Sequence, residues 1–127
     1  MASIVLDASV ILAHINREPG SERAEAFFGD ALISAVNLSE VVGKLAERGA
    51  SLGLVRAALS RYGLRVAAFD EDLAERAGAL RPQTKAFGLS LGDRACLALA
   101  QRSALAVLTA DRAWKDLNLP VEVQLLR

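Results

Sequence analysis

Two aspartates stand just beyond short apolar runs of the chain. Asp7 directly follows residues 3–6 (SIVL), and Asp111 lies three residues after the run 104–108 (ALAVL). Placing a carboxylate against a buried strand costs several kcal/mol unless a partner compensates its charge. Because ligands bind beyond the carboxyl ends of the strands in parallel sheets, we expect both side chains to face one crevice.

Two further acids lie in segments with helical patterning. Glu40 occurs in SAVNLSEVVGKL, where most neighbours are apolar. Asp93 occurs in LSLGDRACLALA, the most apolar helical segment, and shares one helix face with Leu89 and Cys96 through i+4 and i+3 spacing. An acid on the apolar stripe of a helix is an exception to the usual burial pattern, so Asp93 is hard to explain as a solvated charge.

These four carboxylates together predict a site for a hard divalent cation. Mg²⁺ and Mn²⁺ prefer carboxylate and water oxygens, and such an ion would remove the repulsion among converging acids. A bound ion can orient a water, lower its pKa and stabilise the leaving oxygen of a phosphodiester. This chemistry needs no histidine, and the chain has only His14.

Each acid taken alone also has an ordinary explanation. Asp7 and Asp111 are good helix N-cap residues, and Glu40 is more typical of a solvated helix position. Asp93 could cap its helix or pair with a nearby arginine. The metal site is therefore predicted from the set of four and from the strand-end positions, not from any single residue.

The elements that must position these acids alternate between strands and helices. Short apolar runs predict strands at 3–6, 32–34, 65–69, 104–108 and 121–125. Helical patterns with capping residues predict helices at 9–16, 21–28, 36–48, 51–62, 70–81, 89–102 and 111–117. This alternation predicts an α/β fold with a mainly parallel sheet.

Composition limits the remaining classes. A length of 127 residues with 53% hydrophobic residues predicts one folded domain over residues 1–127. The 15 basic and 15 acidic residues balance, so overall charge gives no argument for nucleic-acid binding. The single cysteine excludes an internal disulfide and a cysteine zinc cluster, and with no signal peptide it indicates the cytoplasm. No apolar run has the length of a membrane span.

Four ordered segments of the chain resemble a known family. They are IVLDASVILAHINREPG, SAVNLSEVVGKL, LSLGDRACLALA and VLTADRAWKDL. The sequence resembles the PIN-domain ribonucleases, and in particular the VapC-type toxins of bacterial toxin–antitoxin pairs. Each motif alone is weak, but the four in order and at this spacing are specific and span essentially the whole chain. The resemblance implies a Rossmann-like three-layer α/β/α fold and a Mg²⁺- or Mn²⁺-dependent endoribonuclease.

The resemblance also implies roles for particular residues. The acids of the family fall on Asp7, Glu40, Asp93 and Asp111, as catalytic and metal-binding residues. The family's two hydroxyl residues fall on Ser9 and Thr109, which are expected to hold water, metal or carboxylate in place. Asp116 is a candidate auxiliary acid, although a five-residue offset on a helix places it on a different face from Asp111.

The partners that the resemblance implies are RNA and a small protein. The protein is a VapB-type antitoxin whose C-terminal segment would lie in the acidic groove. A homodimer within a larger toxin–antitoxin assembly is also expected, with no membrane partner.

Three polar residues near the acids have two interpretations each. Arg112 and Lys115 follow Asp111 and are candidates for phosphate contacts, or they belong to a solvated helix face. Asn37 lies one turn before Glu40 and would either bond into the site or cap its helix.

Other functions remain open or conflict with particular residues. A haloacid-dehalogenase-like phosphatase needs a second aspartate where this chain has Ser9, and dinucleotide binding needs glycines that DASV lacks. Two alternatives stay open. One is a PIN nuclease of RNA processing that has no antitoxin. The other is a non-catalytic module whose acidic groove binds a partner.

Overall fold

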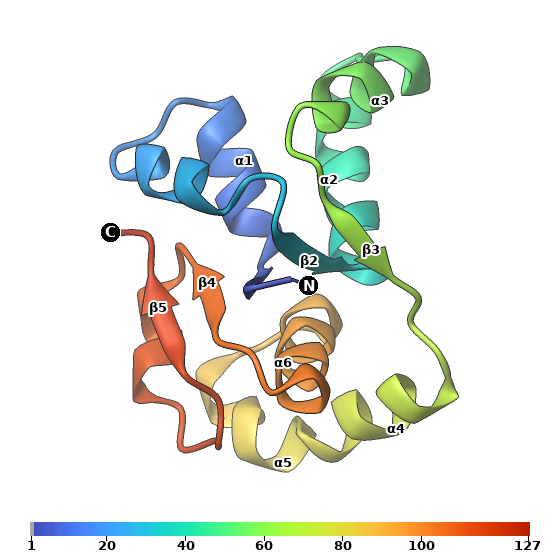
Figure 1. Ribbon diagram of the computed structural model, residues 1–127. Helices are drawn as coiled ribbons and strands as arrows, with labels where there is room; N and C mark the ends of the chain where they lie inside the picture. Colours follow the sequence, from blue (N-terminus) through green and yellow to red (C-terminus); the bar gives the residue numbers. More distant parts are fainter. Residues whose placement is uncertain (1) are drawn as a thin grey trace.

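The computed structural model describes residues 2–127 and contains one five-stranded sheet (Figure 1). The strands are β1 (Ile4–Leu6), β2 (Ala31–Ser34), β3 (Arg65–Ala67), β4 (Val107–Thr109) and β5 (Val123–Leu125). Their order across the sheet is β3-β2-β1-β4-β5, and every neighbouring pair is parallel. The predicted α/β fold is confirmed, and its sheet is wholly parallel.

Helices cover both faces of this sheet. The α-helices are α1 (Ala8–Ile15), α2 (Ala35–Glu47), α3 (Leu52–Ser60), α4 (Glu71–Ala79), α5 (Arg81–Thr84) and α6 (Leu91–Ser103). Three 3-10 helices complete the chain: η1 (Ser21–Phe27), η2 (Lys85–Phe87) and η3 (Arg112–Asp116). Within residues 2–127, none of the helices has the length and apolarity that a membrane crossing requires.

Alternation along β1 separates two apolar cores. Ile4 and Leu6 pack with buried residues of α1, α2 and α3, whereas Val5 faces buried residues of α4 and α6. Successive side chains of a strand point to opposite faces, so this central strand is buried on both sides. The result is the three-layer α/β/α arrangement, with α1 to α3 on one side and α4 to α6 on the other (Figure 1).

Side-chain caps begin most of the longer helices. Ser34, Ser51, Asp70 and Ser90 each accept a hydrogen bond from a backbone N–H in the first turn of the helix that follows. Such caps satisfy donors that have no partner inside the helix. Because Ser34 is the last residue of β2, its cap fixes the start of α2 directly at the end of that strand.

Several predicted boundaries differ from the observed ones for local reasons. The strand expected at 104–108 begins at Val107, because Ala104 adopts a left-handed conformation with φ 53° and ends α6. The segments expected as helices at 21–28 and 111–117 are 3-10 helices. The helix expected to continue to residue 81 ends at Ala79, and Pro82 lies in the first turn of the next helix, α5, where proline is tolerated.

Candidate active site

Asp7 lies at the carboxyl end of β1 and is almost fully buried, with 4% of its surface exposed. It occupies the N-cap position of α1, but its side chain makes no capping bond. Instead, one oxygen, Oδ2, accepts hydrogen bonds from Ser9 Oγ at 2.6 Å and from Thr109 Oγ1 at 2.9 Å. Asp7 therefore has the predicted N-cap position without the capping bond, and two hydroxyls fix the orientation of its carboxylate instead.

Other acids alter the electrostatics of Asp7. Burial, together with the smaller effects of the Asp93 and Glu40 charges, raises the pKa of its carboxyl from 3.8 to about 6. The hydrogen bonds from Ser9 and Thr109 act in the opposite direction. Like charges near a carboxylate disfavour its ionised form, so these three acids share one electrostatic environment.

Glu40 is held against α6 by Asn37 and Gly92. The fully buried Asn37 donates from Nδ2 to Glu40 Oε1 at 2.9 Å and to the Gly92 carbonyl at 3.0 Å. A methyl group on Gly92 would lie 2.5 Å from Glu40 Cδ, so the carboxylate occupies the space that glycine leaves free. Asn37 lies inside α2, so the helix-cap interpretation of this residue is wrong.

Asp93 has a capping role and faces the same region. Its Oδ2 accepts from the Ser90 backbone N–H at 2.9 Å, while Ser90 Oγ accepts from the Asp93 N–H at 3.2 Å. This reciprocal capping box fixes the first turn of α6. Asp93 is half-buried rather than part of the fully buried stripe, and its charge still acts on Asp7.

Asp111 differs from the other three acids. It is exposed, and its Oδ1 accepts from the Ala113 N–H at 3.0 Å, which caps η3. Its own N–H donates to Thr109 Oγ1 at 3.0 Å, so the hydroxyl that holds Asp7 also contacts the backbone of Asp111. The expected cap is thus present, and Asp111 is not among the charges that shift the pKa of Asp7.

The remaining sequence-predicted residues lie on η3. Arg112 donates from a guanidinium nitrogen to the Arg127 carbonyl at 2.9 Å, and Lys115 Nζ donates to the Val123 carbonyl at 2.9 Å. Asp116 is the exposed last residue of η3. Both cations therefore tie η3 to β5 and the residues that follow it.

The donor chemistry of these residues suits a hard cation. Within residues 2–127, no group of three or more histidine, cysteine, aspartate or glutamate side chains is close enough to enclose a metal ion. The oxygens nevertheless match what Mg²⁺ and Mn²⁺ prefer, and Mg²⁺ commonly takes one or two carboxylates and several waters. Asn37 Oδ1, which is buried and has no hydrogen-bond partner among residues 2–127, adds a further unused oxygen beside Glu40.

Sequence reasoning did not single out Gly92 or the burial of Arg94. The Arg94 guanidinium is buried and donates to the Ala77 carbonyl at 3.0 Å, which joins α6 to α4. Only the apolar pattern around Gly92 signalled close packing there. The nearby Cys96 is fully buried, and burial together with the charge of Asp7 raises the pKa of its thiol.

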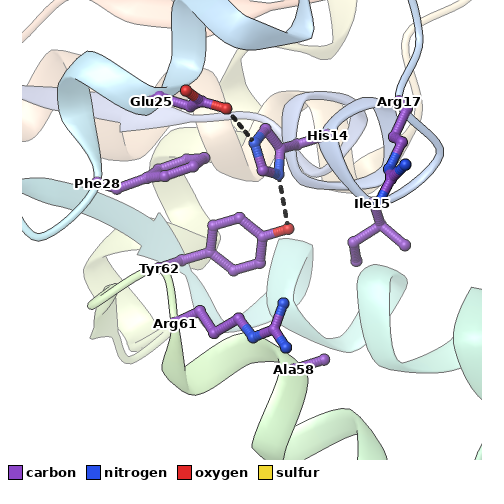
Figure 2. A pocket seen from close by; sticks show the side chains of 8 residues that line it. All are labelled: His14, Ile15, Arg17, Glu25, Phe28, Ala58, Arg61 and Tyr62. Atoms are coloured by element: carbon purple, nitrogen blue, oxygen red, sulfur yellow. Dashed lines mark hydrogen bonds and ion pairs between the residues drawn. The ribbon is translucent and has the colours of Figure 1, made fainter.

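A separate hollow of about 500 Å³ surrounds His14 (Figure 2). His14 Nδ1 lies 3.0 Å from the Tyr62 hydroxyl and Nε2 lies 3.0 Å from Glu25 Oε2. Phe28 and Tyr62 contact the histidine ring edge to face. These contacts join α1 and η1 to the end of α3, so the histidine has a packing role and none of the four predicted acids lines this hollow.

Comparisons with known proteins agree with this architecture. The family profile described as PIN domain matches residues 4–119. A toxin–antitoxin complex from Klebsiella pneumoniae contains a chain that is 24% identical, with 98% of both chains covered and a TM-score of 0.77. VapBC-5 from Mycobacterium tuberculosis is 25% identical over 100% of this chain and 99% of that chain, with a TM-score of 0.60.

A third similar structure belongs to a protein described by its activity. It is VapC20 from Mycobacterium tuberculosis, described as a toxin that cleaves the sarcin–ricin loop. It is 22% identical over 85% of this chain and 88% of its own, with a TM-score of 0.67. A likeness at this identity concerns the fold. No curated protein matches the chain in sequence.

Proposed function

Since the chain belongs to the PIN domain family, we propose that it is a divalent-metal-dependent endoribonuclease formed by a single PIN domain. Its catalytic carboxylates are Asp7, Glu40 and Asp93, and the exposed Asp111 is a fourth carboxylate at the edge of the site. The observation that carries this proposal is the state of Asp7, which is buried, held by two hydroxyls and electrostatically coupled to Glu40 and Asp93. Perturbed acids of this kind are typical of functional sites.

Asp7, Glu40 and Asp93 would hold the ion, which is Mg²⁺ or Mn²⁺. When bound, the ion supplies an activated water and positive charge for the leaving oxygen of a phosphodiester. The chain's own contribution is to fix the ligands. Partners that orient metal ligands commonly change affinity or activity by about 10–100-fold when they are removed.

Each proposed ligand has such a hydrogen-bond partner. Ser9 and Thr109 orient Asp7 from α1 and β4, and Ser90 orients Asp93 at the start of α6. Asn37 orients Glu40 from within α2. The ligands are therefore held by hydrogen bonds from four elements that meet at the carboxyl edge of the sheet.

The biological role that we propose is that of a VapC-type toxin. This role is supported by two of the similar structures, the toxin–antitoxin complex from Klebsiella pneumoniae and VapBC-5, a member of the VapBC family of toxin–antitoxin systems. The partners are then an RNA substrate and a VapB-type antitoxin, and the toxin itself forms a homodimer. A PIN nuclease of RNA processing would share the catalytic site but would have no antitoxin.

Cleavage of a structured RNA pool by purified protein tests the catalytic proposal. The assay compares Mg²⁺, Mn²⁺ and EDTA for the wild type and Asp93→Asn. We expect discrete fragments only when the metal and Asp93 are both present, and the fragment ends then identify the substrate. Metal-independent cleavage, or full activity of Asp93→Asn, would contradict the proposal. Bound metal without any cleavage would favour the non-catalytic binding module.

A further inference from the structure

A groove of about 430 Å³ begins beside the proposed active site and runs between α1 and α2. We call it the α1–α2 groove; its lining residues used below are Ser9, Leu12, Asn16, Lys44, Arg48 and Asp111. Ser9 is the residue whose hydroxyl holds Asp7, so one end of this groove adjoins the carboxylates. The groove is therefore continuous with the place where a scissile phosphodiester must lie.

The direction of the groove follows from helix periodicity. Ser9, Leu12 and Asn16 are spaced i, i+3 and i+7, which places them on one stripe along α1 and its C-cap. At 1.5 Å per residue, this stripe extends roughly 10 Å away from the Asp7 end. The groove thus has room for part of the RNA sugar–phosphate backbone beyond the cleaved bond.

A second stripe, on α2, leads from an acid to two cations. Glu40, Lys44 and Arg48 follow one another at i+4 spacing. Lys44 lines the α1–α2 groove and also lines the shallow hollow that contains Glu40. This ammonium group therefore lies between a proposed metal ligand and the groove.

The groove is also lined by Glu18, which pairs with Arg127 at 2.8 Å and whose pKa is lowered mainly by that arginine, with a smaller effect of the Arg48 charge. Lys44 and Arg48 keep donors for a further ligand. Within residues 2–127, the one ion pair of Lys44 is with Glu47 at 4.0 Å, and both side chains are largely exposed, so the pairing is weak. Arg48 donates from one nitrogen to Asn16 Oδ1 at 2.8 Å, which orients its guanidinium and leaves further N–H donors unused. Arg112 and Lys115 each donate to a backbone carbonyl, and neither is among the residues that line the groove.

We propose that the α1–α2 groove binds the phosphate backbone of the RNA next to the cleaved bond, with Lys44 and Arg48 as positioning residues. This inference rests on the proposed function, because RNA in the groove lies next to a cleaved bond only if the carboxylates at the end of the groove are catalytic. Cations that contact phosphates fix the register of a nucleic acid without reading its sequence. Lys44 and Arg48 therefore act on RNA affinity and leave the chemical step to the carboxylates.

The test measures RNA binding and cleavage separately. Binding of a fluorescently labelled, mixed-sequence single-stranded RNA is followed by anisotropy at several salt concentrations, in an Asp93→Asn background so that the RNA stays intact. Lys44→Gln and Arg48→Gln are each expected to lower the slope of log affinity against log salt by about 0.7 to 1, and Lys44→Arg is expected to restore it. Arg56→Gln removes the same charge from α3, outside the groove, and serves as the matched control.

Cleavage kinetics give the second readout. With Asp93 intact, Lys44→Gln/Arg48→Gln is expected to raise KM with little change in kcat, as for loss of uniform binding. If the Lys44 and Arg48 variants still cleave RNA and have the same salt slopes and KM values as Arg56→Gln, the proposal that the α1–α2 groove binds RNA would be overturned. The proposed nuclease function would then still stand. A wild type that neither binds nor cleaves RNA would overturn both.

Discussion

Thr109 donates its hydroxyl to Asp7 across 102 positions of the chain, with Oγ1 and Oδ2 separated by 2.9 Å. The same oxygen of Thr109 accepts the Asp111 N–H at 3.0 Å. The pairing of β1 with β4 brings these residues together, because Leu6 and Leu108 lie opposite each other just before them. One hydroxyl therefore links the central acid to the backbone of the fourth acid.

Replacing Thr109 by valine tests this link. The shape is retained, but Asp7 loses a donor, so we expect metal-dependent cleavage to fall by about 10–100-fold. Loss of the buried hydrogen bond should also cost about 1–3 kcal/mol of the free energy of unfolding, measured by urea titration. Thr84→Val is the control, because Thr84 is equally buried and bonds the Leu80 carbonyl away from the acids. Cleavage that falls equally in both variants would contradict a specific role for Thr109.

The raised pKa of Asp7 predicts how the stability of the metal-free protein depends on pH. A pKa near 6 in the folded state, against 3.8 in the unfolded state, means that Asp7 binds its proton more tightly in the folded protein than in the unfolded chain. The stability contribution of Asp7 is then complete below pH 3.8 and is lost as the pH rises through about 6, to a total of roughly 3 kcal/mol.

Thermal melts in EDTA over that pH range measure this contribution. The pKa values of the Glu18 and Asp70 carboxyls are lowered, mainly by hydrogen bonds from Arg127 and from the Leu73 N–H, and act in the opposite direction. The difference between the wild type and Asp7→Asn therefore isolates Asp7. We expect Asp7→Asn to melt higher than the wild type above pH 6 and the difference to shrink in acid. Parallel curves would count against a protonated Asp7.

Gly92 provides a test of the contact between α6 and Glu40. Alanine would normally stabilise a helix relative to glycine by about 0.5–1 kcal/mol, but here the added methyl group would displace the Glu40 carboxylate. Because a carboxylate at the end of a side chain can move, we expect Gly92→Ala to keep its melting temperature and to lose much of its metal-dependent cleavage.

Gly78→Ala is the matched control for this substitution, because a methyl group on this glycine of α4 meets nothing within 4 Å. It should gain the helical stabilisation and keep full cleavage. If Gly92→Ala cleaves RNA as well as Gly78→Ala does, Glu40 is not held in a functional position by that contact.

The contacts of His14 predict a variant that loses stability but keeps RNA cleavage, the reverse of what we expect for Gly92→Ala. Tyr62→Phe removes the hydroxyl that lies 3.0 Å from His14 Nδ1 and keeps the ring that packs on Phe28. We expect a loss of about 1 kcal/mol, or about 3–5 °C in Tm, with RNA cleavage unchanged. A strong loss of cleavage at unchanged Tm would show that this hollow takes part in the reaction.

Local signals in the sequence predicted the order of elements well. Alternation of apolar strands and capped helices was sufficient because Ser51, Asp70 and Ser90 cap helices that the patterns also indicate. The boundary near Ala104 was missed, since a left-handed alanine that ends a helix leaves no mark in an apolar run.

The sequence named the candidate site residues, whose roles stay predictions, but it did not predict their contacts. The strand-end rule placed Asp7 and Asp111 in one crevice, yet it could not tell that Thr109 contacts both or that the Asp111 carboxylate caps η3. Contacts between distant segments, such as that of Glu40 with Gly92, depend on helix packing that no local pattern encodes.

Direct titration of Mn²⁺ into the metal-free protein tests the central claim, that Asp7, Glu40 and Asp93 form one divalent-cation site. Calorimetry of the wild type, Asp7→Asn and Asp93→Asn needs no knowledge of the RNA, and Asp70→Asn controls for loss of an exposed acid that pairs with Arg102. We predict that both site variants lose about 10-fold or more in Mn²⁺ affinity while Asp70→Asn binds like the wild type. Equal affinity in all four proteins would contradict the account.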